Sequence, residues 1–179
     1  MRATSTLPLC LAVLCAAGLS LHSADADAGR VRAHGVAAGA DGRAAGTVAA
    51  GQNARGAYAR GHHLVGDRQG NVHGGSSAAV VGAAGGQAQR QGSFSRQADG
   101  SAAHAGSFSA QGAQGGTLAS SGNIARDADG QLDGSRSTTA TGRNGGSYVG
   151  ATQVADGHVT HTGSCRTAAG ETIACPGGR

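Results

Sequence analysis

A turn signal recurs at an interval of 30 residues and constrains the fold of this chain more than any single residue does. Ala98-Asp99-Gly100 is followed 30 residues later by Ala128-Asp129-Gly130. The same Ala-Asp-Gly signal stands at 40–42 and 155–157, and a variant, Arg68-Gln69-Gly70, stands at 68–70. A second, glycine-rich signal lies between them, at 82–86, 112–116 and 142–146. A fixed period of about 20 to 50 residues indicates a repeat architecture with one supersecondary unit in each period.

The few large apolar residues follow the same period. One series is Leu64, Phe94, Ile124 and Val154, and another is Tyr58, Ala88, Leu118 and Tyr148. Leu118 and Ile124 belong to one segment and are separated by an even number of residues, so in a strand they share a face. The pattern predicts successive strands with their large residues on one face and small or polar residues on the other.

The Ala-Asp-Gly signal suits a three-residue hairpin loop that ends in a glycine in the left-handed region. We therefore expect an all-β fold, an antiparallel repeat meander of about 30-residue units. The predicted units are 43–70, 71–100, 101–130, 131–157 and the chain from 158 onward. A parallel β-solenoid with one coil per period also fits. A largely disordered chain is the third possibility, because bulky hydrophobic residues are scarce.

The N-terminus has the features of an export signal. Arg2 precedes an apolar stretch from Leu7 to Leu21, and small-residue cleavage sites follow at 24–26 and 26–28. We expect residues 1–28 to be a signal peptide and the protein to be exported to the periplasm, the cell surface or the extracellular space. The remaining divisions that we predict are a flexible lead-in at 29–42, a β-repeat domain at 43–176 and a tail at 177–179.

Two cysteines remain beyond the predicted signal peptide. Cys165 and Cys175 are placed symmetrically about Gly170, which predicts a short hairpin with both thiols on one face. Export implies an oxidising compartment. We expect a Cys165–Cys175 disulfide that stabilises the terminal unit by about 2 to 3 kcal/mol.

The chain beyond the predicted signal peptide is basic, and all its basic residues are arginines. From Gly29 it has 13 Arg (14 minus Arg2) and 8 acids (10 minus Asp25 and Asp27), a formal charge of +5. This charge attracts polyanions such as nucleic acid, lipid A phosphates or acidic glycans. The candidate binding residues are Arg60, Arg90, Arg96, Arg126 and Arg136, with Arg43, Arg55 and Arg143 as further members. Because they are spread singly along the chain, a solvated surface is the favoured explanation for them.

No pattern of residues indicates catalysis or metal binding. Glu171 is the sole Glu, no Lys is present for a phosphate-binding loop, and no serine stands in a nucleophile elbow. His158 and His161 would point to opposite faces of a strand. The segment 127–133 resembles part of an EF-hand loop but lacks its outer ligands. Four aromatic residues are too few for a base-stacking platform. We therefore expect no enzyme activity, no cofactor, no metal and no small-molecule substrate.

Residues 60–176 resemble secreted Ala/Gly/Ser-rich β-repeat proteins of Gram-negative bacteria. The features shared with them are the Ala-Asp-Gly turns and the C-terminal cysteine pair followed by Pro176. The resemblance implies export and repeats, and it implies nothing about chemistry. Our leading expectation is a non-catalytic structural or adhesin-like protein that self-associates or joins the cell surface or matrix. The alternatives are a binding module for acidic polymers and an intrinsically disordered secreted protein.

Overall fold

The structure is a computed structural model that describes residues 29–175. The predicted signal peptide and the predicted tail lie outside the described residues. Within residues 29–175 there is no helix with the length and hydrophobicity needed to span a membrane.

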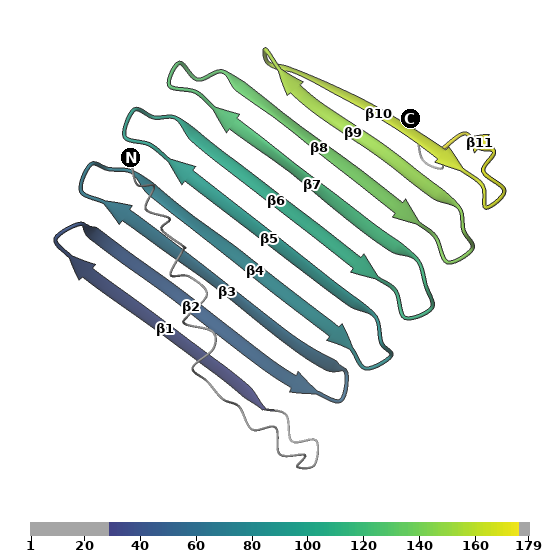
Figure 1. The fold of residues 1–179 in the computed structure, drawn as a ribbon, viewed down its shortest axis with the longest axis horizontal. Coiled ribbons are helices and arrows are strands. Elements are labelled where there is room, and N and C mark those ends of the chain that lie inside the picture. The colour runs from purple at the N-terminus through teal and green to yellow at the C-terminus, as the bar shows by residue number, and fades with distance from the viewer. Residues whose placement is uncertain (1–28, 176–179) are drawn as a thin grey trace, which may run out of the picture.

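The described chain forms one open antiparallel sheet (Figure 1). Its strands are β1 (Arg30–Gly39), β2 (Gly42–Asn53), β3 (Gly56–Asp67), β4 (Val72–Gly82), β5 (Gln87–Arg96), β6 (Ala102–Gln111), β7 (Thr117–Arg126), β8 (Leu132–Thr141), β9 (Ser147–Ala155), β10 (His158–Arg166) and β11 (Thr172–Ile173). Each strand pairs with the next one in the chain, and the order in the sheet is the order in the sequence. The antiparallel meander is therefore confirmed over the parallel solenoid and over the disordered chain.

The expected flexible lead-in at 29–42 is wrong for most of its length. Residues 30–39 form β1, and all ten pair with β2, from Arg30 opposite Gly51 to Gly39 opposite Gly42. The backbone explains the difference. A strand at a sheet edge is held by main-chain hydrogen bonds, which alanine and glycine make as well as larger residues do.

The turns divide the sheet more finely than the 30-residue sequence period does. Glycines with positive φ recur every 15 residues, at 70, 85, 100, 115, 130 and 145. At the Ala98-Asp99-Gly100 turn the Gly100 amide donates to Gln97 O and the Gln97 amide donates to Ser101 O. The same pair of bonds closes the turns at 83–85 and 143–145. The structural repeat is thus one strand and one turn. The sequence period is twice as long because alternate turns lie at opposite ends of the sheet.

Two-residue loops replace this turn elsewhere. The loops at 40–41, 54–55 and 156–157 each join paired strands with two residues between the flanking pair. Asp156 and Gly157 both have positive φ, as a tight hairpin turn requires. The expected three-residue Ala-Asp-Gly loop is therefore confirmed at 98–100 and 128–130, and at 155–157 the loop is shorter.

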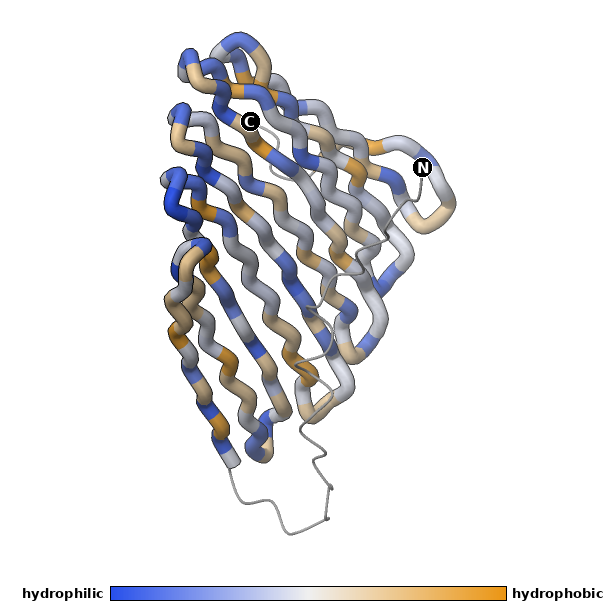
Figure 2. Tube along the Cα trace, turned by 60° about the vertical axis from the view of Figure 1, so that its left-hand side comes forward, coloured by the Kyte–Doolittle hydropathy of each residue, from blue (hydrophilic) through white to orange (hydrophobic). Residues whose placement is uncertain are grey.

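The sheet has no covering layer among the described residues. Only Ala49 and Cys165 are buried apolar residues, and large side chains such as Phe94 and Ile124 are about two-fifths exposed. Figure 2 shows hydrophobic and hydrophilic positions interspersed along a single layer. The ladder of backbone bonds and the cross-strand side-chain pairs therefore hold the fold, instead of a packed core.

The predicted disulfide is confirmed. Cys165 at the end of β10 is bonded to Cys175, and their Cα atoms lie 5.2 Å apart. The turn between them is the same turn that recurs through the sheet, with Gly170 donating to Thr167 O.

Candidate polyanion-binding face

The strand register sorts the charged side chains onto one side of the sheet. Residues directly opposite each other on paired strands share a face. Following the pairs from β1 to β10 therefore defines two faces. We call one of them the arginine face, because it carries all the strand arginines except Arg166. These are Arg30, Arg32, Arg43, Arg60, Arg90, Arg96, Arg126 and Arg136.

The opposite side, which we call the serine face, is nearly neutral. It carries most strand serines, and among the strands its charged residues are Asp67, Asp133 and Arg166. In the part of the sheet that the structure describes, no strand Asp or Glu lies on the arginine face. The remaining acidic residues of residues 29–175 lie in turns. The molecule therefore has a strongly positive side and a weakly charged one, although its net charge is modest.

The nearest cross-strand neighbours of these arginines are small, apolar or uncharged. Arg32, Arg60 and Arg90 lie in one row on alternate strands, with Ala49 and Ala78 between them. Because strands are about 4.8 Å apart, successive arginines in this row are about 10 Å apart. Ala49 is only 5 % exposed, which we attribute to the aliphatic stems of the arginines on both sides of it. Their guanidinium groups have no acidic partner in the row and remain free to bind an external anion.

The predicted polyanion-binding residues all belong to this face. Arg60, Arg90, Arg96, Arg126 and Arg136 come from β3, β5, β7 and β8, and the sheet brings them to one side. Arg43 joins them from β2, whereas Arg55 and Arg143 lie in turns. Sequence reasoning missed Arg30 and Arg32, because they fall in the segment that it assigned to a flexible lead-in.

Two of these arginines are oriented by hydrogen bonds. Arg136 Nε donates to Ser120 Oγ over 2.8 Å, and Ser120 is in turn 3.0 Å from Thr138 Oγ1. Arg126 Nη2 donates to the carbonyl oxygen of Gly100 over 2.8 Å. Each of these bonds uses one donor of a guanidinium group that has five, so the remaining donors stay available for a ligand.

All four aromatic residues of the chain also lie on the arginine face. They are Tyr58, Phe94, Phe108 and Tyr148. Their number is small, as the sequence shows. On the arginine face Phe108 pairs directly with Arg90, whereas the direct partners of Tyr148 are Ala140 and Cys165. The common face of the aromatic residues and the arginines could have been predicted from the residue numbers. All four aromatic residues are even-numbered, and so are Arg60, Arg90, Arg96, Arg126 and Arg136.

A groove crosses the strands on the arginine face. One part, of 500 Å³, has Gly92, Gly106 and Gly122 in its lining. These glycines lie side by side on β5, β6 and β7, so they form a floor without side chains. Arg90 and Phe108 lie on one side of this floor, and His104 and Ile124 lie on the other. A second part, of 710 Å³, continues the groove towards β1 and shares Ser76, Gly92 and His104.

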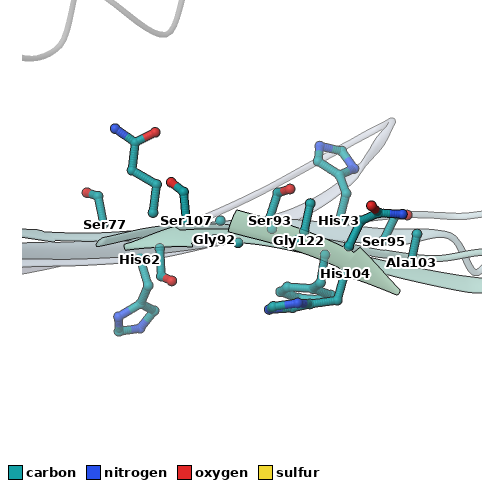
Figure 3. Close-up of a pocket in the computed structure, with 18 of the residues that line it drawn as sticks. His62, His73, Ser77, Gly92, Ser93, Ser95, Ala103, His104, Ser107 and Gly122 are labelled. Atoms are coloured by element: carbon teal, nitrogen blue, oxygen red, sulfur yellow. The ribbon is translucent and has the colours of Figure 1, made fainter. Parts of the chain in front are cut away.

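The serine face has a larger and chemically different hollow. It measures 1550 Å³ and runs from β1 to β9. Figure 3 shows Ser77, Ser93 and Ser107 on this side of the sheet and His62 and His104 on the other. Across residues 29–175, serines of this face hydrogen-bond to one another or to Asn123, and none of them to a histidine. His63 and His73 also line this hollow from the same face.

The histidines of residues 29–175 are not arranged as a metal site. His62 and His63 point to opposite faces, as do His158 and His161. His161 is held by Thr152 Oγ1 at 2.9 Å and lies 3.3 Å from the Tyr148 hydroxyl. Over the described range, no three side chains of His, Cys, Asp or Glu are close enough together to hold a metal ion.

Comparison of the chain with protein-family models, with curated proteins and with solved structures finds no match. The arginine face and its groove are therefore the features from which a function can be inferred.

Proposed function

We propose that this protein is an exported, non-catalytic binding module whose arginine face takes an acidic polymer laid across the strands. One observation carries the proposal: eight of the nine strand arginines share a face that has no strand carboxylate. A field of one sign over a flat surface raises the local concentration of a polymeric counter-ion. The spacing of the arginines across many strands favours a long ligand over a small one.

The arginines suit phosphate or carboxylate groups for a further reason. A guanidinium group is planar and forms two parallel hydrogen bonds to such an anion, which an ammonium group cannot do. The chain has no lysine at all. Inorganic polyphosphate and heparin are therefore suitable probes, because they present phosphates and acidic sugars respectively.

A salt titration of polyphosphate binding tests the proposal. We expect the affinity to fall steeply between about 50 and 200 mM salt, because bound counter-ions are released from the polymer. Replacing Arg60, Arg90 and Arg96 with serine should weaken binding at least tenfold and flatten the salt dependence. Replacing the turn residues Arg55, Arg68 and Arg143 with serine removes the same charge and is the matched control. Equal losses for the two triple variants would contradict the proposal.

Self-association as a structural or adhesin-like protein is the second candidate, and the uncovered apolar residues favour it. Of the large exposed apolar side chains, only Val31, Val48, Val81 and Val149 lie on the serine face. Pairing through the arginine face would also bring like charges together, so it should require high salt or a bound polyanion. Sedimentation at low and high salt, with and without polyphosphate, separates the two candidates. Assembly at low salt without a polyanion would favour self-association as the primary function.

Export is tested separately. Mass spectrometry of the secreted protein should find an N-terminus just after residue 24, 26 or 28, and an intact Met1 in the cytosol would contradict this part of the proposal.

A further inference from the structure

Three of the four aromatic rings lie across glycines of the sheet. A Cβ added at Gly51 would stand 2.8 Å from Tyr58 Cε1, and a Cβ added at Gly74 would stand 2.6 Å from Phe94 Cε1. Tyr148 occupies the same kind of position over Gly150. A ring that lies across a glycine covers the backbone on its inner side and presents its outer side to the solvent. Tyr58 and Phe94 accordingly remain 36 % and 39 % exposed.

These rings are interleaved with the arginines. On β3, Tyr58 and Arg60 are two residues apart on the same face, a distance of about 7 Å. On β5, Arg90 and Phe94 lie on either side of Gly92, in the floor of the groove. The groove is therefore lined by Arg90 together with the rings of Phe94 and Phe108, and Tyr58 and Arg60 lie on the same face outside its lining. This combination matches a ligand that carries both negative charges and flat aromatic rings.

Building on the proposed acidic-polymer function, we propose that the ligand of the arginine face is a single-stranded nucleic acid. Its phosphates would contact Arg60 and Arg90, and its bases would stack on Phe94 and on the outer sides of Tyr58 and Tyr148. Proteins that bind single strands without sequence preference use the same two elements, a basic groove and aromatic side chains. A duplex keeps its bases inside, so it could not stack them on the exposed rings.

The absence of tryptophan gives a direct readout. The chain has two tyrosines and no Trp, and both tyrosines lie on the arginine face. Stacking of a base on either ring should quench the tyrosine emission of the protein. Polyphosphate binds through charge alone and should leave this emission unchanged. A decrease in tyrosine emission therefore reports base stacking, and binding without such a decrease reports charge neutralisation alone.

The experiment compares an oligothymidylate of about 12 nucleotides with polyphosphate of equal charge and with duplex DNA of equal length. We expect the oligothymidylate to bind at least tenfold more tightly than polyphosphate, to quench tyrosine emission and to exceed the duplex in affinity. Phe94→Leu should weaken oligothymidylate binding about tenfold and leave polyphosphate binding unchanged. Ile124→Leu, at an aliphatic position of the same row, is the matched control. Circular dichroism of each variant reports whether the sheet has folded.

Three results would overturn this inference while leaving the acidic-polymer function intact. The first is equal affinity for oligothymidylate and polyphosphate with no quench. The second is equal or tighter binding of the duplex. Loss of affinity for both polymers in the Phe94→Leu variant, with an unchanged dichroism spectrum, would also overturn it. Failure of every polyanion to bind the unmodified protein would instead contradict the proposed function.

Discussion

The Tyr58 ring lies over Gly51, its direct partner on the neighbouring strand, with the ring atoms Cε1 and Cζ 2.8 and 3.1 Å from where a Cβ of residue 51 would stand. The space above Gly51 is thus filled from β3, and the large side chain of one strand compensates for the missing side chain of another. Such pairs support a sheet that has no second layer.

Gly51→Ala should displace the Tyr58 ring without disturbing the backbone. The three atoms nearest to the new methyl group all belong to the tyrosine side chain. We therefore expect the unfolding free energy to change by less than about 1 kcal/mol. Tyrosine quenching by oligothymidylate should diminish, because one of the two rings loses its position. Urea unfolding and a fluorescence titration measure the two effects. An unchanged quench would show that the position of Tyr58 does not matter for binding.

Single arginine substitutions should change the salt dependence of polyphosphate binding. Arg60→Ala and Arg90→Ala should each reduce the slope of log K against log salt by about 1 if the residue contacts a phosphate. Arg166→Ala on the serine face should leave the slope unchanged, since that side chain bonds to Gly170 O in the terminal hairpin. Binding titrations at several salt concentrations provide the slopes, and equal slope changes for all three variants would indicate a diffuse charge effect.

The left-handed turn glycines should be sensitive to substitution for conformational reasons alone. Gly100 has φ of +91°, and a Cβ there would meet no atom within 4 Å. Gly100→Ala should therefore cost about 1 to 2 kcal/mol through backbone strain. Gly35→Ala in β1 is the control, because that position also has open space but lacks a positive φ. Urea denaturation of both variants checks this, and equal stabilities would mean that the turn tolerates a side chain.

Two carboxylates should make the fold sensitive to acid, Asp67 at the end of β3 and Asp99 in the turn at 98–100. The Asn71 side chain donates to Asp67 and holds the pKa of that carboxyl below its ordinary value of 3.8. The Ser101 amide does the same for the pKa of Asp99. Both pKa values are lowered in the folded state. The unfolded chain therefore binds more protons than the folded protein when the pH lies between the folded and the unfolded pKa values. The stabilisation is therefore complete above the unfolded pKa values and is lost as the pH falls through the folded ones.

The variant with Asp67→Asn and Asp99→Asn tests this dependence. It should be less stable than the unmodified protein at neutral pH and approach it in stability as the pH falls through the lowered pKa values of the two carboxyl groups. Urea unfolding from about pH 7 down to about pH 2 provides both curves. Parallel curves over the whole range would show that these two carboxylates do not carry the acid sensitivity.

The sequence by itself determined the architecture. Turn glycines at fixed intervals set the strand lengths, and three-residue loops place residues of equal parity opposite one another. Phe94 consequently faces His104. The even spacing of Leu118 and Ile124 put them on one face, as the register confirms. These features depend on local backbone geometry, so a linear pattern is enough to predict them.

Only the tertiary structure decided which residues make the candidate site. A two-residue loop pairs residues of opposite parity, so Arg43 of β2 shares a face with Arg60 of β3 although their numbers differ in parity. The same register brings β1 into the sheet and adds Arg30 and Arg32. Charges that are solitary along the chain become neighbours because hydrogen bonding brings successive strands to within about 5 Å of each other. The spacing of residues along the sequence does not specify the distance between neighbouring strands.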